Sequence, residues 1–239
     1  MACPRGHSFD VARSGYVNLL QPQERRSRQP GDAAAAIAAR RRLHDRGIGR
    51  PLLEAMGAML AASAADTIVD AGCGEGFYLG SLAEGTGARG YGVDISIAAV
   101  DAAARRYPAC QWIVANADRL LPFAERSASA ILSITGRRNA AEFHRVLKED
   151  GRLLIGIPAP DELIELRGRG RDRAAAAMEE FAGRFTLAAQ SRATATADLD
   201  AAAVEDVLHA IYRPMQPRAP GAMRLTFSLD LLLFRPVSG

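Results

Sequence analysis

Residues 67–76 read TIVDAGCGEG, and this stretch decides the fold. A short apolar run, typical of a buried strand, ends here at an acid and three alternating glycines. Residues 77–87 then predict a helix, 89–96 a second strand that ends in an acid, and 97–108 a second helix. A strand that leads through a glycine turn into a helix and another strand predicts a parallel sheet covered by helices on both faces.

The same alternation continues to the end of the chain. Further strands are predicted at 110–118, 128–135, 152–160, 184–195 and 223–236, and further helices at 140–151 and 199–212. The last strand follows a stretch rich in proline and glycine, which indicates a hairpin-like return and an antiparallel final strand. Ahead of the sheet, residues 33–46 and 50–63 predict two helices.

Composition sets outer limits on function. The 239 residues can form one domain plus an appendage, and a net charge of +3 with a pI near 9.0 is compatible with a nucleic-acid partner. Arginines gather in residues 24–50 and 165–173, where they form either solvated faces or a nucleic-acid surface. Three dispersed cysteines argue against a disulfide framework. Without a secretory signal or an apolar run long enough to span a bilayer, we expect a cytoplasmic protein with no membrane partner.

The glycine loop allows two classes of cofactor. Dinucleotide-binding folds place a pyrophosphate on a G-x-G-x-x-G loop, whereas this loop reads D-x-G-x-G-x-G and carries Glu75 inside it. Carboxylates repel a diphosphate but attract a cationic group. S-adenosylmethionine (SAM), which has an amino group, a sulfonium centre and no phosphate, therefore suits Asp70 and Glu75 better.

The ends of the next two strands agree with SAM. Asp94 lies at the end of the second strand, where it can accept hydrogen bonds from both ribose hydroxyls. Ala117 and Asp118 end the third strand, where adenine would meet a backbone N–H and a side-chain acceptor, and Ile95 can pack on the adenine face. The alternative for Asp94 and Asp118 is helix N-capping, a common role for acids after a strand.

These strand ends, in this order, resemble the class I SAM-dependent methyltransferases over residues 66–235. The resemblance implies a Rossmann-like α/β fold whose sheet has seven strands, the last one antiparallel. It also implies a set of cofactor-binding residues: Asp70, Gly72, Cys73, Gly74, Glu75, Gly76, Asp94, Ile95, Asn116, Ala117, Asp118 and Ser133. Cys73 is interpreted as a small loop residue and not as a nucleophile.

The methyl acceptor must be inferred from other segments, because the fold does not choose it. The fourth strand ends in SITGRRN, which has neither the Asn/Asp-Pro-Pro-aromatic motif of base amino-methylases nor the Pro-Cys of C5 enzymes. The segments CPRGHSFDVARSGYVNLL, RRSRQPGD, AARRRLHDRG, DAGCGEGFYLG and IPAPDELIELRG occur in that order. Together they resemble the large-subunit (23S) rRNA guanine-N1 methyltransferases, which implies ribosomal RNA as the partner.

The chain departs from that family near the acceptor. Glu162 stands where better-known members have a histidine, and Gly49 where they have a tyrosine. The resemblance places Arg40, Arg41, Arg137, Arg138, Asn139 and Glu162 on the RNA or acceptor side. Glu162 and Asp32 are the candidates for a base that takes the guanine N1 proton, and no single catalytic residue is assigned.

Cys3 and His7 form half of a metal site. The family has an N-terminal zinc module in which C-x-x-C precedes C-x-x-x-H, and this chain begins at the second pair. We therefore expect residues 1–22 to be a truncated zinc-module-like segment that lacks tightly bound zinc unless upstream ligands are present, which elemental analysis tests. Residues 23–64 are expected to form a helical extension, and 65–239 the methyltransferase domain.

Two alternatives to rRNA methylation remain at this point. A small-molecule methyltransferase would have the same sheet and SAM residues, with a closed apolar acceptor pocket. A protein that binds SAM or RNA but has lost its acceptor site would explain the altered SITGRRN segment. A homodimer is a possible assembly in each case.

Overall fold

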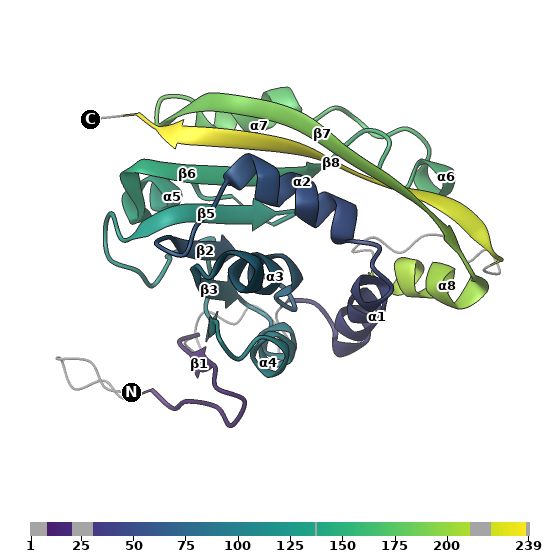
Figure 1. Ribbon diagram of the computed structural model, residues 1–239, viewed down its shortest axis with the longest axis horizontal. Helices are drawn as coiled ribbons and strands as arrows, with labels where there is room; N and C mark the ends of the chain where they lie inside the picture. The colour runs from purple at the N-terminus through teal and green to yellow at the C-terminus, as the bar shows by residue number, and fades with distance from the viewer. Residues whose placement is uncertain (1–8, 21–30, 137, 211–220, 238–239) are drawn as a thin grey trace.

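The centre of the fold is a mixed sheet, seen in a computed structural model that describes residues 9–20, 31–136, 138–210 and 221–237. Within the described residues it has eight strands in the order β1-β4-β3-β2-β5-β6-β8-β7 (Figure 1). The strands are β1 (Val17–Asn18), β2 (Thr67–Ala71), β3 (Arg89–Asp94), β4 (Gln111–Val114), β5 (Ala128–Ile134), β6 (Leu147–Pro158), β7 (Phe185–Leu199) and β8 (Met223–Pro236). Strands β1 to β6 pair in parallel, and β8 runs antiparallel to both of its neighbours.

The expected Rossmann-like α/β sheet with an antiparallel last strand is confirmed, with one strand more than predicted. The extra strand is β1, in the N-terminal segment for which no strand was predicted. Val17 and Asn18 pair with Ile113 and Val114 of β4, and the Leu19 amide donates to the Val114 carbonyl at 2.8 Å. This pairing satisfies backbone groups that would otherwise lie open on the edge of β4.

Helices cover both faces of the sheet. They are α1 (Ala34–Asp45), α2 (Arg50–Leu60), α3 (Phe77–Thr86), α4 (Ile97–Arg106), α5 (Ala140–Val146), α6 (Ile164–Arg167), α7 (Ala174–Phe181) and α8 (Ala201–Ala210). The apolar sides of α2, α3 and α4 form one core with the sheet, and those of α5 and α7 form the other. Successive strand residues supply opposite cores, so that Ile68 packs under α2 and α3 while Val69, equally buried, faces the other layer.

A third apolar cluster joins the N-terminal extension to the far end of the sheet. Leu43 of α1 packs with α8 and with Leu199 and Leu225 of β7 and β8. Figure 1 shows β7 and β8 extending past the other strands and bringing α8 beside α1. The extension is thus packed into the domain, close to the edge at which the parallel strands end.

No helix of the described residues is long and apolar enough to cross a membrane.

The predicted helix over 140–151 is wrong in its second half. The helix α5 ends at Val146, and Leu147 begins β6 with extended backbone angles. Leu147 is 2% exposed and pairs with Ala128 of β5, so burial of its side chain under the sheet outweighs the helical preference of the segment that follows.

Candidate active site

The glycine loop joins β2 to α3 and is bonded to β3. Gly72, Gly74 and Gly76 all have positive φ angles, of 90°, 54° and 83°, which residues with a side chain rarely adopt. The amides of Gly72 and Cys73 both donate to the Val93 carbonyl, at 2.8 and 3.1 Å. The loop is therefore held open over the ends of β2 and β3, in the position where parallel α/β sheets bind ligands.

Asp94 ties this loop to the following helix. Its Oδ2 accepts from the Gly74 amide at 2.9 Å and its Oδ1 from the Ser96 amide at 2.8 Å. Ser96, and not Asp94, caps α4, because the Ser96 hydroxyl accepts from the Ala99 amide. Burial raises the pKa of the Asp94 carboxyl, and the two amide hydrogen bonds oppose that rise. Asp94 thus lies where the ribose was expected, with its carboxylate already oriented.

Two further carboxylates are buried beside the loop without full hydrogen bonding. Asp70 and Glu75 are each 2% exposed, and Asp70 Oδ1 and Glu75 Oε2 have no hydrogen-bond partner among the described residues. Burial, together with the nearby charge of Asp94, raises the pKa of Asp70 to about 8. Buried acceptors without partners are destabilising unless a ligand satisfies them. Groups that are cationic or donate hydrogen bonds fit this position.

The remaining predicted cofactor residues line the ends of β3, β4 and β5. Ile95 is half-buried against the core of the α2 and α3 face, and Ala117 against the opposite core. Asn116 Oδ1 accepts from the Asp118 amide at 3.1 Å, which shapes the turn after β4, and Asp118 is exposed. Ser133 is buried near the end of β5. The structure brings these residues to one edge of the sheet, next to the glycine loop.

Cys73 is buried in the loop, and burial raises the pKa of its thiol well above the ordinary value, with the charges of Asp94 and Asp70 adding to the rise. A protonated thiol is a poor nucleophile, so this environment agrees with a packing role.

The first helix contributes two side chains, His44 and Arg40, that the sequence did not assign to the cofactor side. His44 Nδ1 lies 2.6 Å from Glu75 Oε1, and the His44 ring stacks on Phe77 with centroids 3.9 Å apart. Arg40 lies beside Gly74, 3.5 Å from the point that a Cβ on that glycine would occupy. Arg41, its neighbour in sequence, is 47% exposed and pairs with Asp45 at 3.9 Å. The signal that could have identified Arg40 and His44 is their spacing of four, which places them on one helix face.

Gly49 also lies at this helix. A Cβ added there would meet His44 Cδ2 and Phe77 Cε1 at 2.8 Å, so the two rings occupy the space where the family's tyrosine would project.

The acceptor side begins at the end of β5. Thr135 is exposed and has a φ of 53°, an uncommon angle for a β-branched residue. Arg138 Nε pairs with Glu180 Oε2 of α7 at 3.0 Å, and Asn139 caps α5 while its Nδ2 donates to the Asp118 carbonyl at 2.8 Å. Both side chains are therefore engaged in packing the loop onto its neighbours. Arg137 lies outside the described residues.

Glu162 follows β6 and is half-buried at the same edge. Its carboxylate accepts from the Ser228 amide of β8. Burial raises the pKa of Glu162 to about 7, which that hydrogen bond and Arg167 partly offset. Burial raises the pKa of the Tyr78 phenol in α3, and the nearby charge of Glu162 raises it further. The charges of Glu75 and Asp70 also raise this pKa. Glu162 and Tyr78 thus connect the acceptor side to the glycine loop.

The proposed metal half-site cannot be placed. Cys3 and His7 lie outside the described residues. Within the described residues no group of three or more His, Cys, Asp or Glu side chains could hold a metal ion. Cys73 and Cys110 are both buried in the sheet domain. The His, Cys, Asp and Glu side chains of the described residues therefore do not form a zinc site.

The residues in and around the glycine loop fit SAM. The buried carboxylates with unpartnered oxygens suit its cationic groups, Asp94 suits the ribose hydroxyls, and the half-buried Ile95 offers an apolar surface to a ring. No phosphate has to be accommodated among these acids.

Comparison with known families agrees with this fit. A family of methyltransferase domains matches residues 68–151, and the N-terminal zinc-ribbon family described as "RlmA, N-terminal" matches residues 1–28. The second match spans Cys3 and His7, as the proposed zinc-module resemblance requires.

Two curated relatives extend over most of the chain. The 23S rRNA (guanine(748)-N(1))-methyltransferase of Streptomyces fradiae is 36% identical over 84% of this chain and 74% of the relative. YxjB of Bacillus subtilis, which has the provisional name 23S rRNA (guanine-N(1)-)-methyltransferase, is 39% identical over 68% of this chain. The matched region spans 59% of YxjB, or about three fifths of its length.

A solved structure supports the fold alone. The methyltransferase in complex with the Trm112 activator of Haloferax volcanii superposes with a TM-score of 0.60 and 22% identity, over 86% of this chain and 96% of that one. The glycine loop, the order of the strands and the extent of the Streptomyces match lead to one conclusion. The chain belongs to the family of 23S rRNA guanine-N1 methyltransferases.

Proposed function

We propose that this chain transfers the methyl group of SAM to N1 of a guanine in large-subunit ribosomal RNA. The observation that carries the proposal is the 36% identity to the Streptomyces enzyme over 84% of this chain, a match that includes the glycine loop and its buried carboxylates. An RNA substrate also implies that the protein works in the cytoplasm, where ribosomes are made.

The cofactor supplies an activated methyl group on a sulfonium sulfur. Asp70 and Glu75 would face its cationic methionine portion, Asp94 its ribose, and the turn at Asn116 to Asp118 its adenine, with Ile95 against the ring and Ser133 at the end of β5. The chain's main contribution is to fix this arrangement, because transfer from a sulfonium is favourable once donor and acceptor are aligned.

Guanine N1 carries a proton that must be removed, and Glu162 is the best-placed candidate to accept it. It lies at the acceptor edge, is half-buried, and has a pKa of about 7, so a large fraction is ionised at neutral pH and can still take up a proton. Asp32, the other candidate, is engaged with Arg40 at 2.9 Å. The target guanine must be turned out of its stack to reach this edge.

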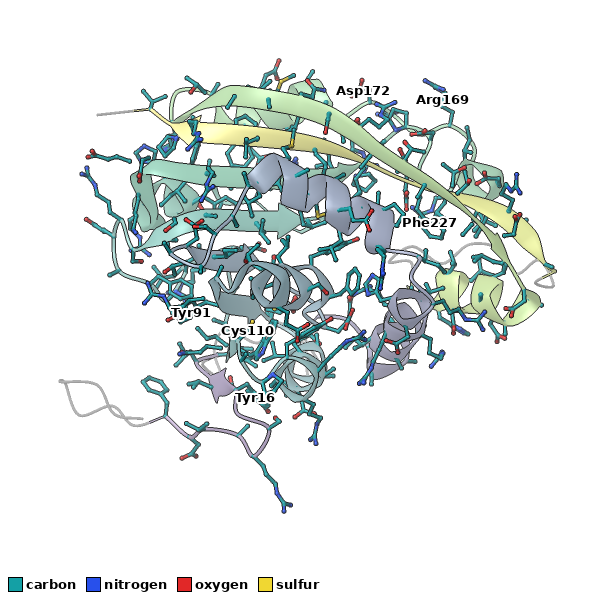
Figure 2. All side chains as sticks on the ribbon, in the orientation of Figure 1. Tyr16, Tyr91, Cys110, Arg169, Asp172 and Phe227 are labelled. Atoms are coloured by element: carbon teal, nitrogen blue, oxygen red, sulfur yellow. The ribbon has the colours of Figure 1, made fainter. Side chains whose placement is uncertain are left out.

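Exposed arginines near Glu162 provide a surface for the RNA backbone. Arg169, Arg171 and Arg173, between α6 and α7, are exposed, and their side chains make no hydrogen bond or ion pair to another described residue. Figure 2 shows Arg169 pointing outward from this connection. Gly170 donates to the Pro160 carbonyl at 2.6 Å, which ties the connection to the segment that carries Glu162.

The test is methylation of unmodified large-subunit rRNA with tritiated SAM, followed by primer extension, because a methyl group at N1 blocks base pairing. Label in RNA and a stop at one guanine are expected. Absence of label in RNA from a chain that binds SAM would overturn the proposal. Label in a small molecule would instead favour a small-molecule methyltransferase, and light scattering on the same sample distinguishes monomer from homodimer.

A further inference from the structure

The acidic lining of the cofactor site leaves one group of SAM without a partner. Asp70, Glu75 and Asp94 suit its ammonium and sulfonium groups and its ribose hydroxyls. SAM also carries an α-carboxylate, which these same acids would repel at close range. A cation near the glycine loop would offset this repulsion and bind the α-carboxylate.

Arg40 is a cation in that position, and the described residues give hydrogen-bond partners to only one of its two terminal nitrogens. Its Nη2 donates to Asp32 Oδ2 at 2.9 Å and to the Ala210 carbonyl at 3.3 Å. Its Nη1 lies beside Gly74 and makes no hydrogen bond to a described residue. The side chain is 29% exposed, so it is neither sealed in the core nor fully solvated. One edge of the guanidinium is held while the other faces the loop.

The partner that holds Arg40 is fixed to the cofactor-binding edge. The Ser96 hydroxyl donates to the Asp32 carbonyl at 3.1 Å. Gly31 packs so closely on Ser96 that a Cβ at Gly31 would lie 2.6 Å from the Ser96 Cβ. Because Ser96 also donates its amide to Asp94, the turn that orients Asp94 also orients Asp32 and, through it, Arg40.

We propose that Arg40 binds the α-carboxylate of SAM through Nη1 and that Asp32 positions the guanidinium for it. The inference rests on the proposed function, since it requires SAM at the glycine loop. It moves Arg40 from the RNA side to the cofactor side. It also gives the N-terminal extension a direct part in cofactor binding, because the sheet domain supplies the acids and α1 supplies the cation.

The test compares two ligands that differ in the amino-acid portion. S-Adenosylhomocysteine carries the carboxylate, and 5′-deoxy-5′-methylthioadenosine keeps the adenosine but lacks it. In calorimetry, Arg40→Ala is expected to weaken S-adenosylhomocysteine binding about 10- to 100-fold and to leave methylthioadenosine binding within about 2-fold of the unsubstituted chain. Arg41→Ala, one position along the same helix, is the matched control and should leave both affinities unchanged.

The outcomes separate a carboxylate contact from a structural role. Equal weakening of both ligands would overturn the inference, because it would mean that Arg40 shapes the whole pocket. Unchanged binding of S-adenosylhomocysteine would overturn it too. Should Arg40→Ala fail to fold, Arg40→Lys and Asp32→Asn carry the same test, each with a selective loss of S-adenosylhomocysteine of about 3- to 10-fold. An unsubstituted chain that binds neither SAM nor its product contradicts the proposed function instead.

Discussion

The proposed cofactor half and the proposed acceptor half of the site lie on the same edge of the sheet but are built in different ways. In the cofactor half, Asp70 and Asp94 lie in β2 and β3 and Glu75 lies in the loop that follows β2, and backbone amides hold Asp94 in place. In the acceptor half, Glu162 is held by β8 and Arg138 by α7, partners that are distant in sequence. Local backbone geometry thus organises the first half and tertiary packing the second.

Because the two halves of the site are built differently, substitutions in them should have different effects. A change in the cofactor half should lower the affinity for SAM and for its product, whatever the acceptor. A change in the acceptor half should lower the rate or the RNA affinity and leave cofactor binding intact. The following predictions run from the largest expected effect to the smallest.

The first prediction concerns Asp94. Replacing Asp94 with Ala removes the acceptor for the Gly74 and Ser96 amides and the expected ribose contact. S-Adenosylhomocysteine binding, measured by calorimetry, should weaken about 100-fold or more. The control is Asp101→Asn, on the outer side of α4, where the carboxylate pairs with Arg105. Affinity close to that of the unsubstituted chain would show that Asp94 only stabilises the loop.

The second prediction concerns Glu162. Because the ionised form is the base and its pKa is about 7, single-turnover methylation should rise with pH through about 7. Glu162→Gln should remove this inflection and slow transfer about 30- to 100-fold, with product affinity within about 2-fold. Glu165→Gln is the control, since Glu165 accepts from Thr226 on the same segment. An unchanged pH profile in Glu162→Gln would exclude it as the base.

The third prediction concerns the pH dependence caused by Asp70. Its folded pKa of about 8 lies above the ordinary 3.8, so the folded chain holds this proton longer than the unfolded chain. The free energy of unfolding without ligand should therefore fall as pH rises between these values. SAM affinity should rise by up to about 50-fold from pH 6 to 8, because the ionised fraction of Asp70 rises by that factor.

Asp70→Asn should remove the rise in SAM affinity, make the slope of the unfolding free energy shallower, and stabilise the ligand-free chain by about 1–3 kcal/mol at pH 8. The part of the unfolding slope that Glu162 and Asp94 cause, since their pKa values are also raised, should remain. Urea unfolding and calorimetry at several pH values measure the two effects. Asp101→Asn is again the comparison, because Arg105 and Ser14 lower the pKa of Asp101 and it does not titrate in this range. Slopes as steep in Asp70→Asn as in the unsubstituted chain would assign both effects to other groups.

The fourth prediction concerns the arginines between α6 and α7. Replacing Arg169 and Arg171 together with Ala should weaken rRNA binding about 3- to 10-fold and reduce the slope of log K against log salt by about 1.5. The matched control is Arg89→Ala with Arg126→Ala, two exposed arginines at the opposite edge of the sheet. Equal losses in both pairs would mean that net charge, and not this surface, determines RNA binding.

The sequence by itself determined the order of the elements and the cofactor half of the site. An apolar run before glycines predicts β2 and its loop, and acids near the ends of strands reach the same edge because parallel strands share one direction. Asp70 and Asp94 therefore lie together by virtue of chain geometry alone. The family resemblance also followed from segments in a fixed order, and it supplied the proposal of an rRNA substrate, which no local pattern indicates.

The tertiary structure alone decided which distant segments meet. Pairing with β4 turned Val17 and Asn18 into a strand, and burial of Leu147 ended α5 early. Arg40 and Arg41 are alike in sequence, yet one faces the glycine loop and the other faces solvent. Their difference follows from how α1 packs against α8 and α4, a long-range contact that no single segment specifies. The sequence shows both arginines, but only the packing of α1 determines which one faces the glycine loop.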